Sequence, residues 1–347
     1  MPLCQAVSEA RSKVSVDLFT TCPPSRGMDR ETYIRNVRDV SRWSDEAGCE
    51  GMLVYTDNGL VDPWLLAQIV LQNTRSLSPL VAVQPMYMHP YTVAKMVSTL
   101  SYFYNRRISL NFVAGGFTND LVALNDTTPH DKRYDRLVEY VRIIQRLLEG
   151  SSPTSFDGEF YRVERLSLKP PLPTGLFPFI TISGSSEAGL MAAQLLDAMP
   201  VKYPGPADAD AAPPPYHNGG CGMRLGIIAR ETEDESWQIA EERFPADRAG
   251  QIKHELAMKV SDSVWHRTLS EGFKTSNSTR NIYWLRPFES YKTFCPYLVG
   301  SYTQVAEHLS KYLSVGYRKF ILDVPASEEE LAHIGTVFDL ARRRRDM

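Results

Sequence analysis

The run Ser183-Gly184-Ser185-Ser186 is the segment of this sequence best suited to binding an anion. It directly follows an apolar, β-branched stretch and precedes one with helical periodicity, which predicts a turn between a strand and a helix. Glycine allows a close backbone approach, and the hydroxyl and N–H groups at a helix N-terminus complement a phosphate. The alternative is that a serine only caps the helix.

Three more polar side chains stand where they can contact a ligand. His130 and Tyr134 lie one turn apart on the same face of a predicted helix, although a surface histidine at a helix start fits the same spacing. Between them, Arg133 is expected to form a structural salt bridge. Asn111 interrupts an apolar strand, where an amide needs a hydrogen-bond partner; that partner is either a bound ring or a neighbouring side chain. Glycines 115 and 116 would let a ring approach.

Strands and helices must alternate to position these groups. Short apolar runs are separated by amphipathic stretches, a pattern typical of a TIM (β/α)8 barrel. No GxGxxG follows any strand, which argues against a Rossmann fold. The predicted strands are 14–19, 51–55, 80–84, 108–113, 177–182, 197–203, 223–229 and 318–324.

Three segments interrupt the alternation. Residues 155–164 contain Asp157-Gly158 and predict a hairpin. Residues 204–222 are rich in Pro, Ala and Gly and predict an irregular loop. Residues 245–300, with helical periodicity at 251–269, are too long for one barrel connection; they predict a lid or a packed helical excursion. We expect one domain over 1–347, with its core at 14–341.

Composition excludes several classes of protein. The net charge of -3 lacks the basic excess of a nucleic-acid binder, and the basic run 342–345 reads as a solvated helix end. The five cysteines show no metal-ligand spacing, so we expect no metal site and reduced thiols. No apolar segment reaches ~18 residues and the N-terminus lacks a signal core, so a soluble, cytoplasmic protein is expected.

Seven longer motifs follow one another along the chain. They are MHPYTVAK (88–95), NRRISLNFVAGG (105–116), HDKRYDRLVEYVRIIQRLLEG (130–150), FDGEFYRVE (156–164), ISGSSEAGLMAA (182–193), RLGIIARETEDESW (224–237) and LVGSYTQVAEHL (298–309). In their order and spacing these motifs resemble the bacterial luciferase-like flavin-dependent monooxygenases, in particular the alkanesulfonate monooxygenase branch. The resemblance extends from about residue 14 to about residue 341.

The resemblance implies a TIM barrel with an extended loop after the seventh strand. It implies loosely bound reduced FMN, supplied by a separate NAD(P)H:flavin reductase, and a C4a-oxygenated flavin that hydroxylates a small organic substrate or inserts oxygen from O2 into it. Family members are often dimers or tetramers, which favours a homo-oligomer. An F420-dependent hydride-transfer enzyme and a non-catalytic flavin-binding relative are the alternatives.

The resemblance also assigns residues. Ser186, and next Ser185, would contact the FMN phosphate, with Gly184, His130 and Tyr134 beside it. Asn111, Thr56 and Met86 would face the flavin ring. Tyr55, His89 and Arg224 are the candidates for acid, base or anion binding; His89 has helix capping as its alternative, and Arg224 a structural role.

The sequence departs from the alkanesulfonate branch around the expected substrate. Gly226 replaces a histidine, and Asp323-Val324-Pro325-Ala326 replaces a Tyr-Pro-His-like run. Leu60 replaces a cysteine, and the branch's lid arginine falls near Tyr291 or Lys292. These losses make a simple alkanesulfonate a poor substrate, and the space expected at Gly226 and Val324 favours a bulkier or less charged one.

Overall fold

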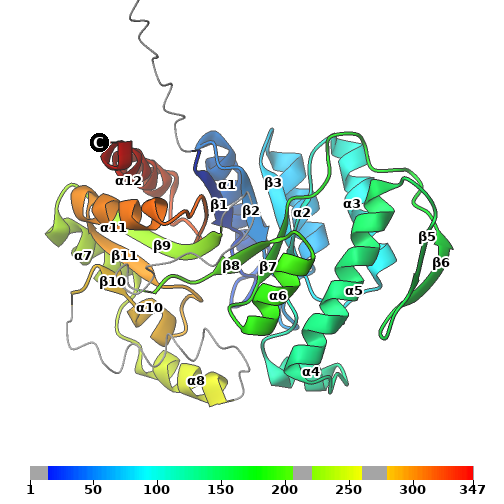
Figure 1. Ribbon diagram of the computed structural model, residues 1–347. Helices are drawn as coiled ribbons and strands as arrows, with labels where there is room; N and C mark the ends of the chain where they lie inside the picture. The colour runs from blue at the N-terminus through cyan, green and yellow to red at the C-terminus, as the bar shows by residue number, and fades with distance from the viewer. Residues whose placement is uncertain (1–14, 206–220, 260–279, 347) are drawn as a thin grey trace, which may run out of the picture.

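Eight parallel strands close into a barrel in the computed structural model, which describes residues 15–205, 221–259 and 280–346 (Figure 1). Closure comes from β9, which pairs with both β12 and β8. The prediction of a TIM barrel is therefore confirmed. The barrel strands are β1 (Asp17–Thr21), β2 (Gly51–Val54), β3 (Ser78–Val83), β4 (Ser109–Phe112), β7 (Ile180–Ser183), β8 (Met199–Lys202), β9 (Gly222–Arg230) and β12 (Lys319–Leu322).

Helices surround the barrel and begin at side chains suited to capping. Asp29, Asp62, Ser186, Thr232 and Ser301 each accept a backbone N–H of the first turn that would otherwise lack a partner. The main helices are α1 (Arg30–Glu46), α2 (Pro63–Asn73), α3 (Pro90–Tyr104), α5 (His130–Glu149), α6 (Glu187–Leu195), α7 (Glu233–Arg243), α11 (Tyr302–Ser314) and α12 (Glu328–Asp346).

Apolar side chains fill both faces of the strands. One small cluster, with Phe19, Leu80 and Val201, joins side chains of separate strands inside the barrel. Larger clusters lie between the strands and the surrounding helices. Strands buried on both faces read as continuous apolar runs, which is why most of them could be found in the sequence.

The hairpin predicted at 155–164 is present. It consists of β5 (Thr154–Asp157) and β6 (Arg162–Leu166), and its loop is tied to the barrel by the Glu139 carboxylate. That carboxylate accepts the N–H groups of residues 159, 160 and 161 at 2.8–3.1 Å. A short helix, α4 (Thr118–Ala123), was not predicted; six residues are too few for a clear periodicity.

The long connection after β9 contains α7, α8 (Arg248–Lys259), β10 (Tyr283–Trp284), α10 (Arg286–Glu289) and β11 (Tyr297–Ser301). Residues 222–225 of β9 pair with β12, whereas 226–230 pair with β11. In Figure 1, α8 and α10 lie at the lower end of the molecule, on the same side as α4. Residues 260–269 of the predicted helix, and most of the predicted 204–222 loop, lie outside the described residues. The single domain and the lid stay predictions.

No helix in the described parts of the chain has the length and apolar character that crossing a bilayer requires. The basic run 342–345 falls in the last turns of α12, as expected.

Candidate active site

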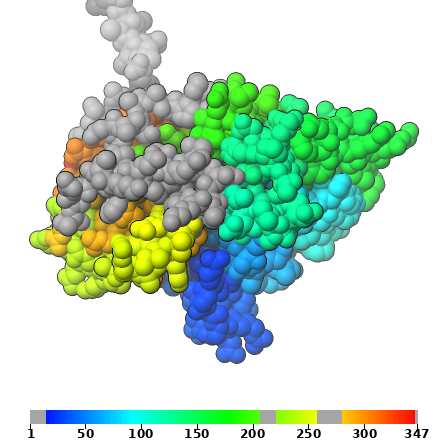
Figure 2. Space-filling view, turned by 90° about the horizontal axis from the view of Figure 1, so that it is seen from below, coloured from blue at the N-terminus to red at the C-terminus, as the bar shows by residue number. Residues whose placement is uncertain are grey.

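A cavity of about 820 Å³ opens at the carboxyl ends of the barrel strands. Its lining comes from the ends of β2, β3, β4, β7, β8, β9 and β12 and from residues 247–253 and 290–294 of the long connection. Figure 2 shows the molecule from this side, with α8 in yellow. The active sites of TIM barrels lie at this end of the strands.

One edge of the cavity is the turn from Ser183 to Ser186. Ser186 caps α6, since its Oγ accepts the Gly189 N–H at 3.2 Å. The Tyr134 ring packs directly on the turn: a Cβ added at Gly184 would lie 2.6 Å from the Tyr134 hydroxyl. Burial raises the pKa of Tyr134, and its hydrogen bond with the Ser186 hydroxyl opposes that rise. The turn therefore collects hydroxyl donors and a helix N-terminus at the cavity wall.

His130 lies at the same edge. Its ring is 5.3 Å from that of Tyr134 in an edge-on arrangement, and its Nδ1 is 2.7 Å from a carboxylate oxygen of Asp131. The two rings lie on one face of α5, as their spacing predicted, and both line the cavity. Arg133 is buried outside the lining, where it donates to the Thr128 carbonyl.

Two amides form part of the cavity wall near this edge. The Asn111 Oδ1 accepts hydrogen bonds from Thr181 at 2.8 Å and Ser183 at 2.9 Å, so neighbours satisfy the oxygen. Gln84 is only 7% exposed, and its Nε2 has no hydrogen-bond partner among the described residues. A buried donor left without a partner costs about 1–3 kcal/mol, which favours a polar ligand at this point.

Gln84, and not Met86, is the residue after β3 whose side chain lines the cavity. Side chains alternate along a strand, so Ala82 and Gln84 at the end of β3 face the cavity. A turn follows, and it places the Met86 sulfur 3.2 Å from Nη1 of Arg136, outside the cavity lining. Met86 therefore lies outside the cavity lining, and its predicted contact with the flavin stays a prediction. The alternation of side chains along β3 was the sequence signal that could have identified Gln84.

His89 is not among the cavity-lining residues either. It is exposed at the start of α3, where its Nδ1 accepts the Tyr91 N–H at 3.1 Å and its ring lies 6.2 Å from that of Tyr161. Of the two possibilities left open by the sequence, helix capping is the one that the structure supports.

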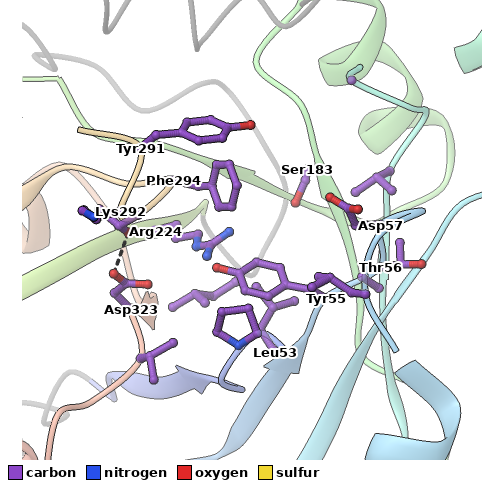
Figure 3. A pocket seen from close by; sticks show the side chains of 18 of the residues that line it. Leu53, Tyr55, Thr56, Asp57, Ser183, Arg224, Tyr291, Lys292, Phe294 and Asp323 are labelled. Atoms are coloured by element: carbon purple, nitrogen blue, oxygen red, sulfur yellow. Dashed lines mark hydrogen bonds between the residues drawn. The ribbon is translucent and has the colours of Figure 1, made fainter. Parts of the chain in front are cut away.

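The opposite end of the cavity is built around Arg224, as Figure 3 shows. Its guanidinium lies 4.7 Å from the centre of the Tyr55 ring and 5.9 Å from that of Tyr203, and its Nη1 donates to the Tyr203 hydroxyl at 3.2 Å. Arg224 is 6% exposed, yet its Nε and Nη2 have no hydrogen-bond partner within the described ranges. A buried cation with spare donors is suited to an oxygen acceptor or an anion.

The space expected at Gly226 is filled. A Cβ there would lie 2.3 Å from the Tyr297 ring, which occupies the position. The Tyr297 hydroxyl donates to Oδ2 of Asp323 at 2.7 Å, and Thr293 donates to the same oxygen at 2.5 Å. The expectation of extra room at Gly226 is therefore wrong, although Val324 does line the cavity.

Residues of the long connection close this end. The Tyr291 and Phe294 rings are 5.7 Å apart, and Phe294 lies 6.3 Å from Tyr55 (Figure 3). Lys292, near which the branch's lid arginine was expected, pairs with Asp247 at 2.6 Å. Leu60 and Thr56 also line the cavity. Apolar rings over a buried cation exclude water and strengthen its electrostatic interactions.

The described residues contain no group of three or more His, Cys, Asp or Glu side chains arranged to hold a metal ion. Cys22, Cys49, Cys221 and Cys295 are buried thiols that form no disulfide among the described residues.

Comparisons with known proteins agree with this geometry. The family model described as "Luciferase-like monooxygenase" matches residues 15–319. The chain is 34% identical over 314 residues to 4-(gamma-L-glutamylamino)butanoyl-[BtrI acyl-carrier protein] monooxygenase BtrO of Niallia circulans, covering 89% of this chain and 92% of that protein.

Solved structures share the fold. The oxygenating constituent of 3,6-diketocamphane monooxygenase from Pseudomonas putida, in complex with FMN, has a TM-score of 0.68 at 15% identity over 95% of this chain and 97% of its own. An F420-dependent secondary alcohol dehydrogenase, in complex with an F420-acetone adduct, has a TM-score of 0.62 at 14% identity, over 94% and 99%.

Proposed function

The chain belongs to the luciferase-like monooxygenase family, and from that premise we propose that it is a two-component enzyme using reduced FMN and O2. One observation carries the proposal. One end of the cavity has a hydroxyl-rich helix N-terminus. The other end has the buried Arg224, two of whose nitrogen atoms lack a hydrogen-bond partner among the described residues, and the Gln84 amide also lines the cavity wall. Such a cavity suits a phosphate at the helix N-terminus, a polar ring beside Gln84 and an oxygen-bearing substrate at Arg224.

The residues at the first edge fit FMN. Ser185, Ser186 and Tyr134 would hold the phosphate at the start of α6. Asn111 and Gln84 would bond the polar edge of the ring, and the unpartnered Gln84 amide favours such a ligand. Nothing lies within 4 Å of a Cβ added at Gly116, which leaves room beside the ring. When bound, reduced FMN reacts with O2 and supplies one oxygen atom to the substrate.

The residues at the other end would position the substrate. Arg224 would donate its N–H groups that lack a partner to a carbonyl or carboxylate oxygen of the substrate. The Tyr55 and Tyr203 rings would fix the position of the guanidinium. Tyr291 and Phe294 would keep water out, which is the lid role predicted for the long connection. A separate flavin reductase would supply the reduced flavin, and we expect a cytoplasmic homo-oligomer.

We extend the proposal to the substrate class: an acyl group carried as a thioester on an acyl carrier protein. BtrO, by its name, acts on such a substrate, and the similarity to BtrO spans 89% of this chain. A thioester carbonyl suits the unpaired Arg224 donors. The polar groups expected around a sulfonate, by contrast, are replaced by Gly226 and the 323–326 run.

Single-turnover oxidation tests the proposal. Enzyme holding photoreduced FMN is mixed with oxygen-18 gas in buffer, with and without an acyl thioester, and the products are analysed by mass spectrometry. We expect one labelled oxygen atom in the acyl product. Tight binding of F420 with weak binding of FMN would instead favour the hydride-transfer alternative, which the likeness to the F420-dependent dehydrogenase keeps open.

A further inference from the structure

The cavity continues beyond the barrel strands on one side. Its lining includes Met28, Asn36, Val40 and Trp43 of the β1–α1 segment, opposite Pro325 at the end of β12. Most of these side chains are apolar. A mostly apolar extension of this kind suits a flexible chain attached to the substrate better than it suits the flavin, whose proposed phosphate site is the turn from Ser183 to Ser186.

The outer face of the same helix is rich in arginine. Arg35, Arg38 and Arg42 recur at intervals of three and four residues, so they form one exposed row along α1, and Arg30 stands at its start. These four arginines line a groove together with Ile34, with Asn73 at the end of α2, and with two carboxylates, Glu31 and Asp39, so its charge remains positive. One face of α1 thus forms a cavity wall and its other face presents positive charge.

Much of this charge is not neutralised locally. Arg42 pairs with Asp39 at 3.1 Å, and Arg30 lies 3.7 Å from Glu31. Arg35 donates only to the Thr32 hydroxyl, at 3.3 Å, and neither Arg35 nor Arg38 has an ion-pair partner within the residues that the structure describes. The groove therefore keeps two unpaired positive charges beside the cavity.

We propose that the arginine groove on α1, defined by Arg30, Arg35, Arg38 and Arg42, docks the acidic helix of an acyl carrier protein. The carrier's arm then enters beside Met28 and Asn36 and places the thioester at Arg224. Charge complementarity argues for this occupant, because acyl carrier proteins are small, strongly acidic helical domains. The inference rests on the proposed function and names its partner. In Figure 2, the blue N-terminal part of the chain, which includes α1, projects at the edge of this face.

Charge reversal tests the docking. The double variant Arg35→Glu with Arg38→Glu is compared with a matched double variant on α12, Arg343→Glu with Arg344→Glu, whose side chains are also exposed. Fluorescence anisotropy measures binding of labelled holo-acyl carrier protein to each enzyme. We expect the α1 variant to bind at least about tenfold more weakly and to lose most of its salt dependence, and the α12 variant to match the parent enzyme.

Activity provides a second readout. The 4-(gamma-L-glutamylamino)butanoyl group is presented on the carrier protein or on free pantetheine, and oxygenation is followed for both. The α1 variant should lose kcat/KM only with the carrier-bound substrate. Equal carrier binding by the α1 variant and the parent, or an equal loss in the α12 variant, would overturn the docking site. The oxygen-18 experiment with free pantetheine thioester judges the proposed function separately.

Discussion

The two ends of the cavity differ in the groups that build them. The proposed flavin end, Ser183–Ser186 with Tyr134, consists of small residues, hydroxyls and a helix N-terminus that neighbouring side chains hold in place. The Arg224 end uses aromatic rings, a buried cation and a carboxylate that accepts two hydroxyls. The flavin end keeps the motif that resembles the family, whereas the Arg224 end has lost the alkanesulfonate-type residues. We infer that the cofactor constrains one end and the substrate the other.

Arg224→Ala should have the largest effect, and it should affect one end of the cavity and not the other. It removes a buried, cavity-lining cation with two donor atoms that lack a partner among the described residues, so kcat/KM for the acyl substrate should fall by roughly 100- to 1,000-fold. The dissociation constant for reduced FMN should change less than about twofold, because the phosphate turn lies at the other end. A comparable loss of flavin binding would show that the two ends are not independent. Tyr203→Phe, which keeps the cation and removes the hydroxyl that accepts from Nη1, should have a smaller effect.

Gly226→Ala tests how tightly the Arg224 end is packed. The new Cβ would meet the Tyr297 ring at 2.3 Å, so overpacking should cost about 1–3 kcal/mol of folding stability. Thermal unfolding should show the loss, and adding Tyr297→Leu should recover part of it. Gly116→Ala serves as the control, since nothing lies within 4 Å of its Cβ. An unchanged melting temperature in Gly226→Ala would contradict this packing.

Ser186→Ala tests the flavin end. Loss of the hydroxyl should weaken FMN binding about tenfold, measured by fluorescence quenching, and leave the KM for the acyl substrate unchanged. Part of any effect comes from the lost cap of α6. Ser301→Ala removes a comparable cap at α11, outside the cavity, and so isolates that part. If both variants bind FMN equally, Ser186 is only a helix cap.

Burial of Glu289, which directly precedes the cavity-lining residues 290–294, predicts a pH dependence of stability. Burial raises the pKa of this carboxyl to about 8, and its Oε1 has no hydrogen-bond partner among the described residues. The folded state holds the proton more tightly than the unfolded chain, so stability should fall as pH rises from the unfolded pKa towards 8. Glu289→Gln should raise the melting temperature by roughly a few degrees at pH 8, and hardly at all at pH 4. Parallel pH profiles for the two proteins would contradict the assignment.

Local patterns predicted the barrel and the flavin end because both depend on neighbours in the sequence. Apolar runs buried on two faces reveal strands, and a turn between strand and helix reveals the N-terminus of α6. Residues three or four apart, such as His130 and Tyr134, meet on one helix face. These contacts are set by helix and strand geometry alone.

The remainder of the site depends on contacts between distant segments. The ring that fills the space at Gly226 comes from Tyr297, and no local pattern links those positions. Likewise, no local pattern predicted the bidentate buried pair of Arg136 with Asp126, whose pKa the guanidinium helps lower to about 2. Which carboxylate an arginine meets depends on the directions of the side chains after folding. The salt bridge expected of Arg133 stays a prediction.

Strand β9 serves two partners in succession, β12 along its first half and β11 along its second. Barrel closure depends on the first half of β9, which pairs with β12 and β8, and not on its pairing with β11. Substitutions at cavity-lining residues 290–294, just before β11, can therefore change the substrate contacts of the Arg224 end while the closed barrel is kept.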